Sequence, residues 1–175
     1  MKIGGLDVKR ATEGEIYIPT PKGEIYLRVK ATPLDFDIDD IFPMPKPPRV
    51  KARRTNGHIE KERDGSIVWD VNLDEPHYKA TEKRISNVRL AMSFAKVTAS
   101  GSGDGCVDFE APLPSDDSVD EEGWLAIYKE IVATGMTDGD LNLVIKKSLQ
   151  LSNQTSEVQE KVLGNFSQEE DSLQD

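Results

Sequence analysis

The chain has 175 residues, of which 37% are hydrophobic and 6% aromatic, and its formal net charge is −10. This length suits one domain with a modest core and appended segments, because soluble domains usually hold a larger apolar fraction. The excess of acidic residues predicts repulsion from nucleic acid and from anionic membranes, so neither is expected as the main partner. The single cysteine, Cys106, excludes an internal disulfide, and no apolar run approaches the ~20 residues of a membrane helix. We therefore expect a cytosolic protein.

Residues 1–32 are expected to form a β section. Apolar and polar residues alternate along 15–20 and along 23–30, and Pro21 and Gly23 supply a turn between the two segments. This pattern predicts an antiparallel β-hairpin, with 6–11 as a candidate third strand.

Residues 33–73 change from acidic to proline-rich to basic. The four prolines within 43–48 favour an extended, polyproline-like backbone. Phe36, Phe42 and Met44 flank or interrupt these prolines, so they are candidate anchors of a strap that lies either on this chain's own helices or on a partner. Beyond the prolines, the pairs Asn56-Gly57 and Asp64-Gly65 are turn signals that predict short strands within 58–71.

A local basic cluster occupies 46–63, where seven Lys and Arg residues accompany two acidic residues. The absence of aromatic residues from this cluster disfavours RNA, because single-stranded nucleic acid usually binds by base stacking on aromatic side chains. The cluster therefore predicts pairing with an acidic surface, on this chain or on a partner.

Residues 74–170 are expected to form a helical domain. Apolar residues recur at helical spacing in 78–98, 121–135, 137–152 and 155–166, which predicts about four amphipathic helices. An acidic Gly/Pro loop, 99–122, interrupts them, and 171–175 are expected to be a disordered tail. The fold class is therefore predicted to be α+β, with a small N-terminal β-hairpin section, an extended Pro-rich connector and a C-terminal helical bundle.

The sequence carries no convincing motif for catalysis, a cofactor or a metal. His58 and His77 stand far apart in the sequence with no paired cysteine, and the acidic run that begins at Asp35 lacks the Gly and Glu of a calcium loop. The glycine-rich stretch 101–105 is not followed by the lysine of a phosphate-binding loop. We therefore expect a non-enzymatic protein with no catalytic, cofactor-binding or metal-binding residues.

Several short motifs occur together in the second half of the chain. The helix of DEPHYKATEKRISNVRLAMSFAKV begins at an acidic-Pro-x-Tyr pattern, and the later segment runs from an apolar helix through an LS turn to EVQEKVLGNF. With the upstream FPMPKPP and DGS, these motifs resemble tail assembly chaperones of long-tailed bacteriophages over about residues 34–170. The chain departs from that group at Asn153-Gln154, where many members have Gly-Leu.

The resemblance implies a protein of the host cell cytoplasm that covers apolar surfaces of tape-measure or tail-tube proteins before tail polymerisation. Two other functions stay open: a structural tail or baseplate adaptor in the virion tail, and a regulator or inhibitor that binds a host protein. Whether the chain associates with itself is also left open. The candidate partner-binding residues, which pack in the domain's own core in the alternative interpretation, are Phe36, Phe42, Met44, Met92, Phe94, Trp124 and Tyr128.

Overall fold

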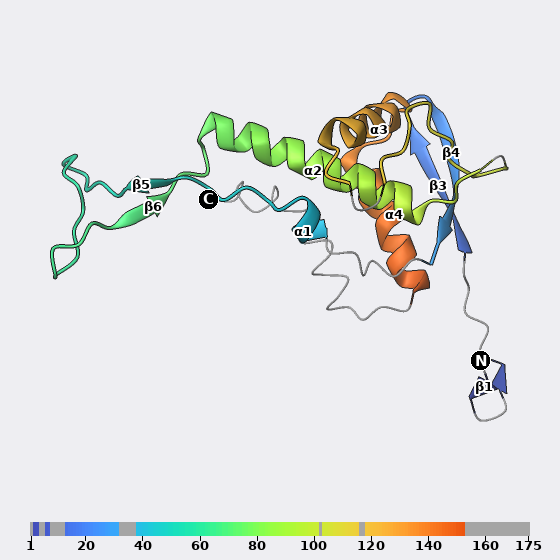
Figure 1. The fold of residues 1–175 in the computed structure, drawn as a ribbon, viewed down its shortest axis with the longest axis horizontal. Helices are drawn as coiled ribbons and strands as arrows, with labels where there is room; N and C mark the ends of the chain where they lie inside the picture. The colour runs from blue at the N-terminus through green and yellow to red at the C-terminus, as the bar shows by residue number, and fades with distance from the viewer. Residues whose placement is uncertain are drawn as a thin grey trace.

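The computed structural model describes residues 2–3, 6–7, 13–31, 38–101, 103–115 and 118–152 of the chain. The described residues form an antiparallel β-hairpin early in the chain and four helices, which confirms the predicted α+β fold (Figure 1). The helix α4 (Asp138–Leu151) contacts both strands of the hairpin, and the helix α2 (Pro76–Val97) packs against α4 and against α3 (Glu121–Ala133). The core lies between the hairpin and these three helices.

The hairpin consists of β3 (Glu13–Thr20) and β4 (Gly23–Lys30), paired from Glu13↔Lys30 to Thr20↔Gly23. The alternation of apolar and polar residues turns one face toward the core, where Ile18, Leu27 and Val29 are buried. The predicted hairpin is thus confirmed. The candidate third strand does not join it as far as the structure describes that segment, because β2 (Leu6–Asp7) pairs with β1 (Lys2–Ile3) in a separate ribbon.

The three longer helices begin at residues that cap them. Pro76 opens α2, and the Glu75 side chain accepts a hydrogen bond from the Tyr78 backbone N–H. Thr137 and Asp140 form a reciprocal capping box at the start of α4. These helices confirm three of the predicted segments, and α1 (Ile38–Ile41) adds one short turn. The remaining predicted helix, 155–166, and the tail 171–175 lie outside the described residues.

The buried residues of α2 are concentrated in its second half, from Val88 to Val97. Its first half extends beyond the core toward the β-structure of 49–71 (Figure 1). The core residues from the hairpin and the three long helices include Ile18, Leu27, Val29, Val88, Met92, Phe94, Trp124, Ile127, Leu141, Val144, Ile145 and Leu149.

The start of the connector docks on this chain. The fully buried guanidinium of Arg89 on α2 donates a hydrogen bond to the carboxylate of Asp39 on α1. Phe42, directly after α1, is buried in the core cluster. The predicted strap therefore lies on the chain's own helices at this point.

The glycine-rich segment after α2 packs along the edge of β4. The Arg28 backbone N–H donates to the Gly105 carbonyl (2.7 Å), and the Ala99 N–H donates to the Arg28 carbonyl (2.9 Å). Gly105 has φ of +74°, and a Cβ atom there would lie 2.6 Å from the Tyr26 ring. Glycine therefore allows both the left-handed turn and the close approach to the hairpin. None of the helices described is long and apolar enough to cross a membrane.

Candidate functional site: a basic arm and an acidic-rimmed pocket

Residues 46–73, which we call the basic arm, project from the N-terminal end of α2, away from the core (Figure 1). Within the arm, β5 (Arg49–Lys51) pairs antiparallel with β6 (Trp69–Val71). Turns at 54–57 and 62–65 reverse the chain, as the Asn-Gly and Asp-Gly pairs predict.

Three backbone segments of the arm meet in a closed ring of hydrogen bonds. The Ala52 N–H donates to the Val68 carbonyl (3.0 Å), the Val68 N–H donates to the Glu60 carbonyl (3.1 Å), and the Glu60 N–H donates to the Ala52 carbonyl (2.8 Å). Each backbone donor in this ring is thereby satisfied within the arm. The arm consequently holds its shape through its own backbone, without burial in the core.

The three residues of the ring are spaced eight apart in the sequence, and the residues that form the turns have the same spacing. Side-chain oxygens of Asn56, Asp64 and Asn72 each accept the backbone N–H two residues further on, at 3.1, 2.9 and 3.1 Å. These contacts are Asx turns, and the bonds from Ser66 lower the pKa of Asp64 below its ordinary value. The sequence shows the spacing of these three residues, but the turn signals identified from it were only the first two.

One face of the arm alternates basic and apolar side chains. Lys51 lies opposite Trp69 in the β5–β6 ladder, Arg53 forms a bridge with Ile59, and Lys61 forms one with Ile67. Residues opposite one another in antiparallel pairs share a face, and so do residues two apart along an extended segment, as 51 and 53, 59 and 61, and 67 and 69 are, which places these side chains on one side of the arm. The three bases are exposed, and Trp69 is 54% exposed. We call this surface the arm face: Lys51, Arg53, Ile59, Lys61, Ile67 and Trp69.

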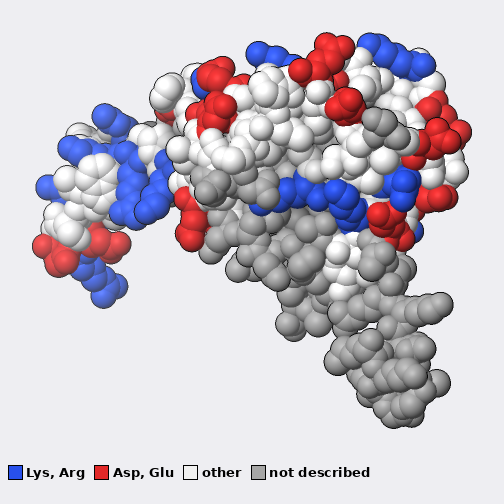
Figure 2. Space-filling view, turned by 45° about the vertical axis from the view of Figure 1, so that its right-hand side comes forward, with Lys and Arg blue, Asp and Glu red and all other residues white. Residues whose placement is uncertain are grey.

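The arm and the rest of the chain carry opposite charge. Residues 46–73 hold seven Lys and Arg and four Asp and Glu, a net charge of +3, which leaves −13 for the remainder of the chain. Figure 2 shows basic side chains over much of the arm and most acidic side chains on the body. The salt bridges between described residues do not include any base of the arm. The arm's bases are therefore presented to solvent and do not pair with the described acidic segments of this chain.

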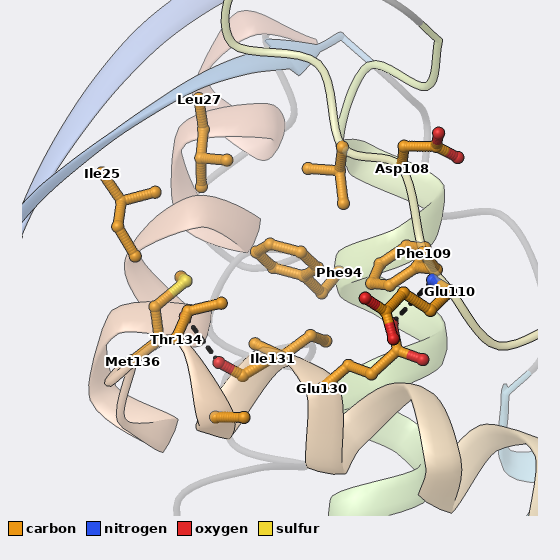
Figure 3. A pocket seen from close by; sticks show the side chains of 12 residues that line it. Ile25, Leu27, Phe94, Asp108, Phe109, Glu110, Glu130, Ile131, Thr134 and Met136 are labelled. Atoms are coloured by element: carbon orange, nitrogen blue, oxygen red, sulfur yellow. Dashed lines mark hydrogen bonds between the residues drawn. The ribbon is translucent and has the colours of Figure 1, made fainter. Parts of the chain in front are cut away.

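A pocket of about 400 Å³ opens in the body between β4, the second half of α2, the loop 107–110 and the end of α3 (Figure 3). Asp108, Glu110 and Glu130 supply carboxylates to its lining. Glu130 accepts backbone hydrogen bonds from Glu110 (3.0 Å) and Ala111 (2.7 Å), which hold the loop against α3. The apolar walls consist of Ile25, Leu27, Phe94, Val107, Phe109, Ile131, Ala133 and Met136.

The structure separates the residues predicted to contact a partner. Phe94 lines the pocket and is also a core residue, 2% exposed. Phe42, Met92 and Trp124 are at most 5% exposed and belong to the core, as the alternative interpretation expects. Their apolar side chains are already covered by this chain.

Two of the other predicted contacts remain near the surface. Tyr128 is half-buried and donates its hydroxyl to Asp138 (2.6 Å), and Met44 is half-buried in the connector. Phe36 lies outside the described residues. The sequence pattern does not identify Trp69, because the basic cluster ends at Arg63 and the pairing of Trp69 with Lys51 is long-range.

Within the described part of the chain, no group of three or more His, Cys, Asp or Glu side chains is placed to hold a metal ion. Comparison of the chain with protein-family models, with curated proteins and with solved structures found no match.

Proposed function

We propose that the chain is a non-catalytic assembly protein that binds another protein through its basic arm. The observation that carries the proposal is the arm face, which presents three bases and an exposed tryptophan on a β-structure held beyond the core. Trp and Arg are the residues that most often dominate the energy of protein interfaces. The acidic body keeps the free chain soluble and disfavours nucleic acid as the arm's partner.

The resemblance to tail assembly chaperones supports placing this binding in bacteriophage tail assembly. A tape-measure or tail-tube protein with an acidic, partly apolar segment is the partner that the arm face fits. Opposite charges would steer the encounter, and the apolar side chains would hold the complex. The complex would form in the host cell cytoplasm, before the tail polymerises.

A structural adaptor in the virion tail is the second candidate, and the projection of the arm favours it. An arm that extends beyond the core suits a permanent contact with a neighbouring subunit. Quantitative proteomics of purified virions separates the two candidates. Stoichiometric presence of the chain supports the adaptor, and its absence supports the chaperone.

Co-expression with a tape-measure or tail-tube protein from the same genome tests the proposal. The arm variant carries Lys51→Glu, Arg53→Glu and Lys61→Glu, and the control carries three charge reversals on the body, Lys83→Glu, Lys129→Glu and Lys146→Glu, at residues that are also exposed. We expect the wild-type chain and the control to copurify with the tail protein and raise its solubility, and the arm variant to lose both effects. No complex with the wild-type chain, or equal loss in both variants, would overturn the proposal. Retrieval of a host enzyme alone would favour an inhibitor.

A further inference from the structure

We infer that the arm face of one copy binds the acidic-rimmed pocket of a second copy, with Trp69 entering the pocket. This inference rests on the proposed function in one respect. It takes the arm as a protein-binding surface and names a partner for it.

The apolar parts of the two surfaces match. The Trp69 side chain is 54% exposed on the arm face, opposite Lys51. The pocket, of about 400 Å³, is walled mainly by apolar side chains such as Phe94 and Ile131. A cavity of ~150 Å³ holds benzene, so this pocket has room for an indole ring.

The charges match as well. Asp108 and Glu110 are exposed on the loop beside the pocket, and Glu130 lies next to them (Figure 3). Lys51 lies opposite Trp69, so an indole in the pocket brings that ammonium group toward these carboxylates. The contact would join a surface of net positive charge to a body of net negative charge, which favours encounter and orientation.

The geometry of α2 directs this contact to a second copy. From Pro76 to Phe94 the helix rises about 27 Å, at 1.5 Å for each residue. Trp69 precedes Pro76 by seven residues, which reach at most about 25 Å when fully extended. To enter its own pocket, the arm would have to stretch back along α2 and break the β5–β6 pairing. The arm as it stands can therefore meet the pocket of another molecule only.

Such a contact is heterologous, because the arm of one copy and the pocket of the other take part. Each pair leaves one arm and one pocket unoccupied, so further copies can add until a ring closes or a chain grows. A copy with a disabled arm and a copy with a disabled pocket can therefore form one pair with each other and nothing larger, which provides the test.

The test measures the mass of the purified full chain by light scattering and sedimentation velocity over a range of concentrations. Trp69→Ser disables the arm. Ala133→Arg places a guanidinium at the pocket, at an exposed C-terminal position of α3 where a cation also suits the helix dipole. We expect the wild-type chain to form oligomers whose size grows with concentration, and each variant alone to be monomeric. An equimolar mixture of the two variants should form heterodimers that do not grow.

Two matched controls accompany these variants. Val132→Arg adds the same guanidinium at an exposed neighbouring position that does not line the pocket, and Leu73→Ser removes an exposed apolar side chain outside the arm face. Both controls should oligomerise as the wild-type chain does. Because Ala133→Arg leaves the arm untouched, the pocket is tested even if Trp69→Ser disturbs the arm's folding.

A wild-type chain that stays monomeric up to its solubility limit would overturn the inference, as would a mixture of variants that forms no heterodimer. These outcomes are separate from the proposed function. A monomeric chain that copurifies with a tail protein through its arm overturns the self-contact alone, and an oligomer that binds no tail protein overturns the tail function alone.

Discussion

The Nη2 atom of Arg89 on α2 lies 2.5 Å from Oδ1 of Asp39 on α1. The two side chains differ in environment, since that of Arg89 is fully buried and that of Asp39 is 51% exposed. Nε and Nη1 of Arg89 have no hydrogen-bond partner among the described residues. Among the described residues, one carboxylate therefore compensates a buried cation whose other two nitrogens have no partner.

Removal of this carboxylate should destabilise the fold. We expect Asp39→Ala to lower the free energy of unfolding by about 3 kcal/mol, because it leaves a buried charge without its partner. Arg89→Met, which replaces the cation by an apolar side chain of similar length, should change stability by less than about 1 kcal/mol or raise it. Urea denaturation of both variants measures the difference. A larger loss for Arg89→Met than for Asp39→Ala would contradict this view of the pair.

Gly105 should tolerate no side chain. In Gly105→Ala the new Cβ would lie 2.6 Å from Cε1 of Tyr26, at a backbone φ of +74°. We expect the free energy of unfolding to fall by about 3 kcal/mol, because the variant combines strain in the left-handed backbone conformation with overpacking against Tyr26. Gly65→Ala is the control, since φ there is +87° and no heavy atom lies within 4 Å of the new Cβ. Thermal denaturation should show a clearly smaller loss for Gly65→Ala, and equal losses would show that the contact with Tyr26 is unimportant.

Tyr128 should make stability fall in alkaline solution. Burial, and then the hydrogen bond to Asp138, raise the pKa of the Tyr128 phenol well above its ordinary value of 10.0. Above pH 10 the unfolded chain loses this proton while the folded chain keeps it, so the free energy of unfolding decreases as pH rises. Tyr128→Phe removes the titrating group and should flatten that decrease.

Urea midpoints of the wild-type chain and of Tyr128→Phe, measured at a series of pH values from neutral to above 10, test this prediction. A residual slope should remain, because the pKa values of Tyr26 and Tyr78 are raised as well. At neutral pH the free energy of unfolding of Tyr128→Phe should be about 1 kcal/mol lower, because the variant lacks the hydrogen bond to Asp138. Identical slopes above pH 10 would show that Tyr128 does not titrate in the way its surroundings indicate.

Charge should set part of the affinity between the arm and the pocket. In the heterodimer of Trp69→Ser and Ala133→Arg chains, adding Lys51→Glu to the Ala133→Arg chain should weaken binding about tenfold, because it places like charges together. Adding Asp108→Lys to the Trp69→Ser chain should then recover most of the loss. Sedimentation at increasing salt gives a second check, since the Debye length falls from about 10 Å at 0.1 M to about 3 Å at 1 M. If the affinity is independent of both charge and salt, the carboxylates beside the pocket do not contribute to binding.

Local patterns were sufficient to predict the hairpin and the three longer helices. Alternation along β3 and β4, the helical spacing of apolar residues and the pair Thr137 and Asp140 act over a few residues, so the sequence shows them directly. The same patterns do not distinguish a side chain buried in its own core from one reserved for a partner. Met92 and Trp124 were open to both interpretations, and tertiary packing placed them in the core.

The arm face was not predicted, because it depends on pairing between residues distant in sequence. Lys51 and Trp69 are opposite each other only when β5 and β6 form a ladder. Arg89 is a related case, since a charged residue on an amphipathic helix is ordinarily expected to face solvent. Its hydrogen-bond partner Asp39 lies on α1, 50 residues away in the sequence, so local patterns do not indicate the burial.

The 22 residues of α2 span about 33 Å, with the arm at one end and the pocket near the other. If copies join by arm and pocket, the length of this helix sets the repeat distance of the assembly and the rotation from each copy to the next. One residue inserted in its first half would lengthen the helix by about 1.5 Å but turn the arm by about 100°. Seven inserted residues would add about 10 Å and almost restore the original heading. The spacing of an assembly could thus be changed without altering either of the surfaces that join it.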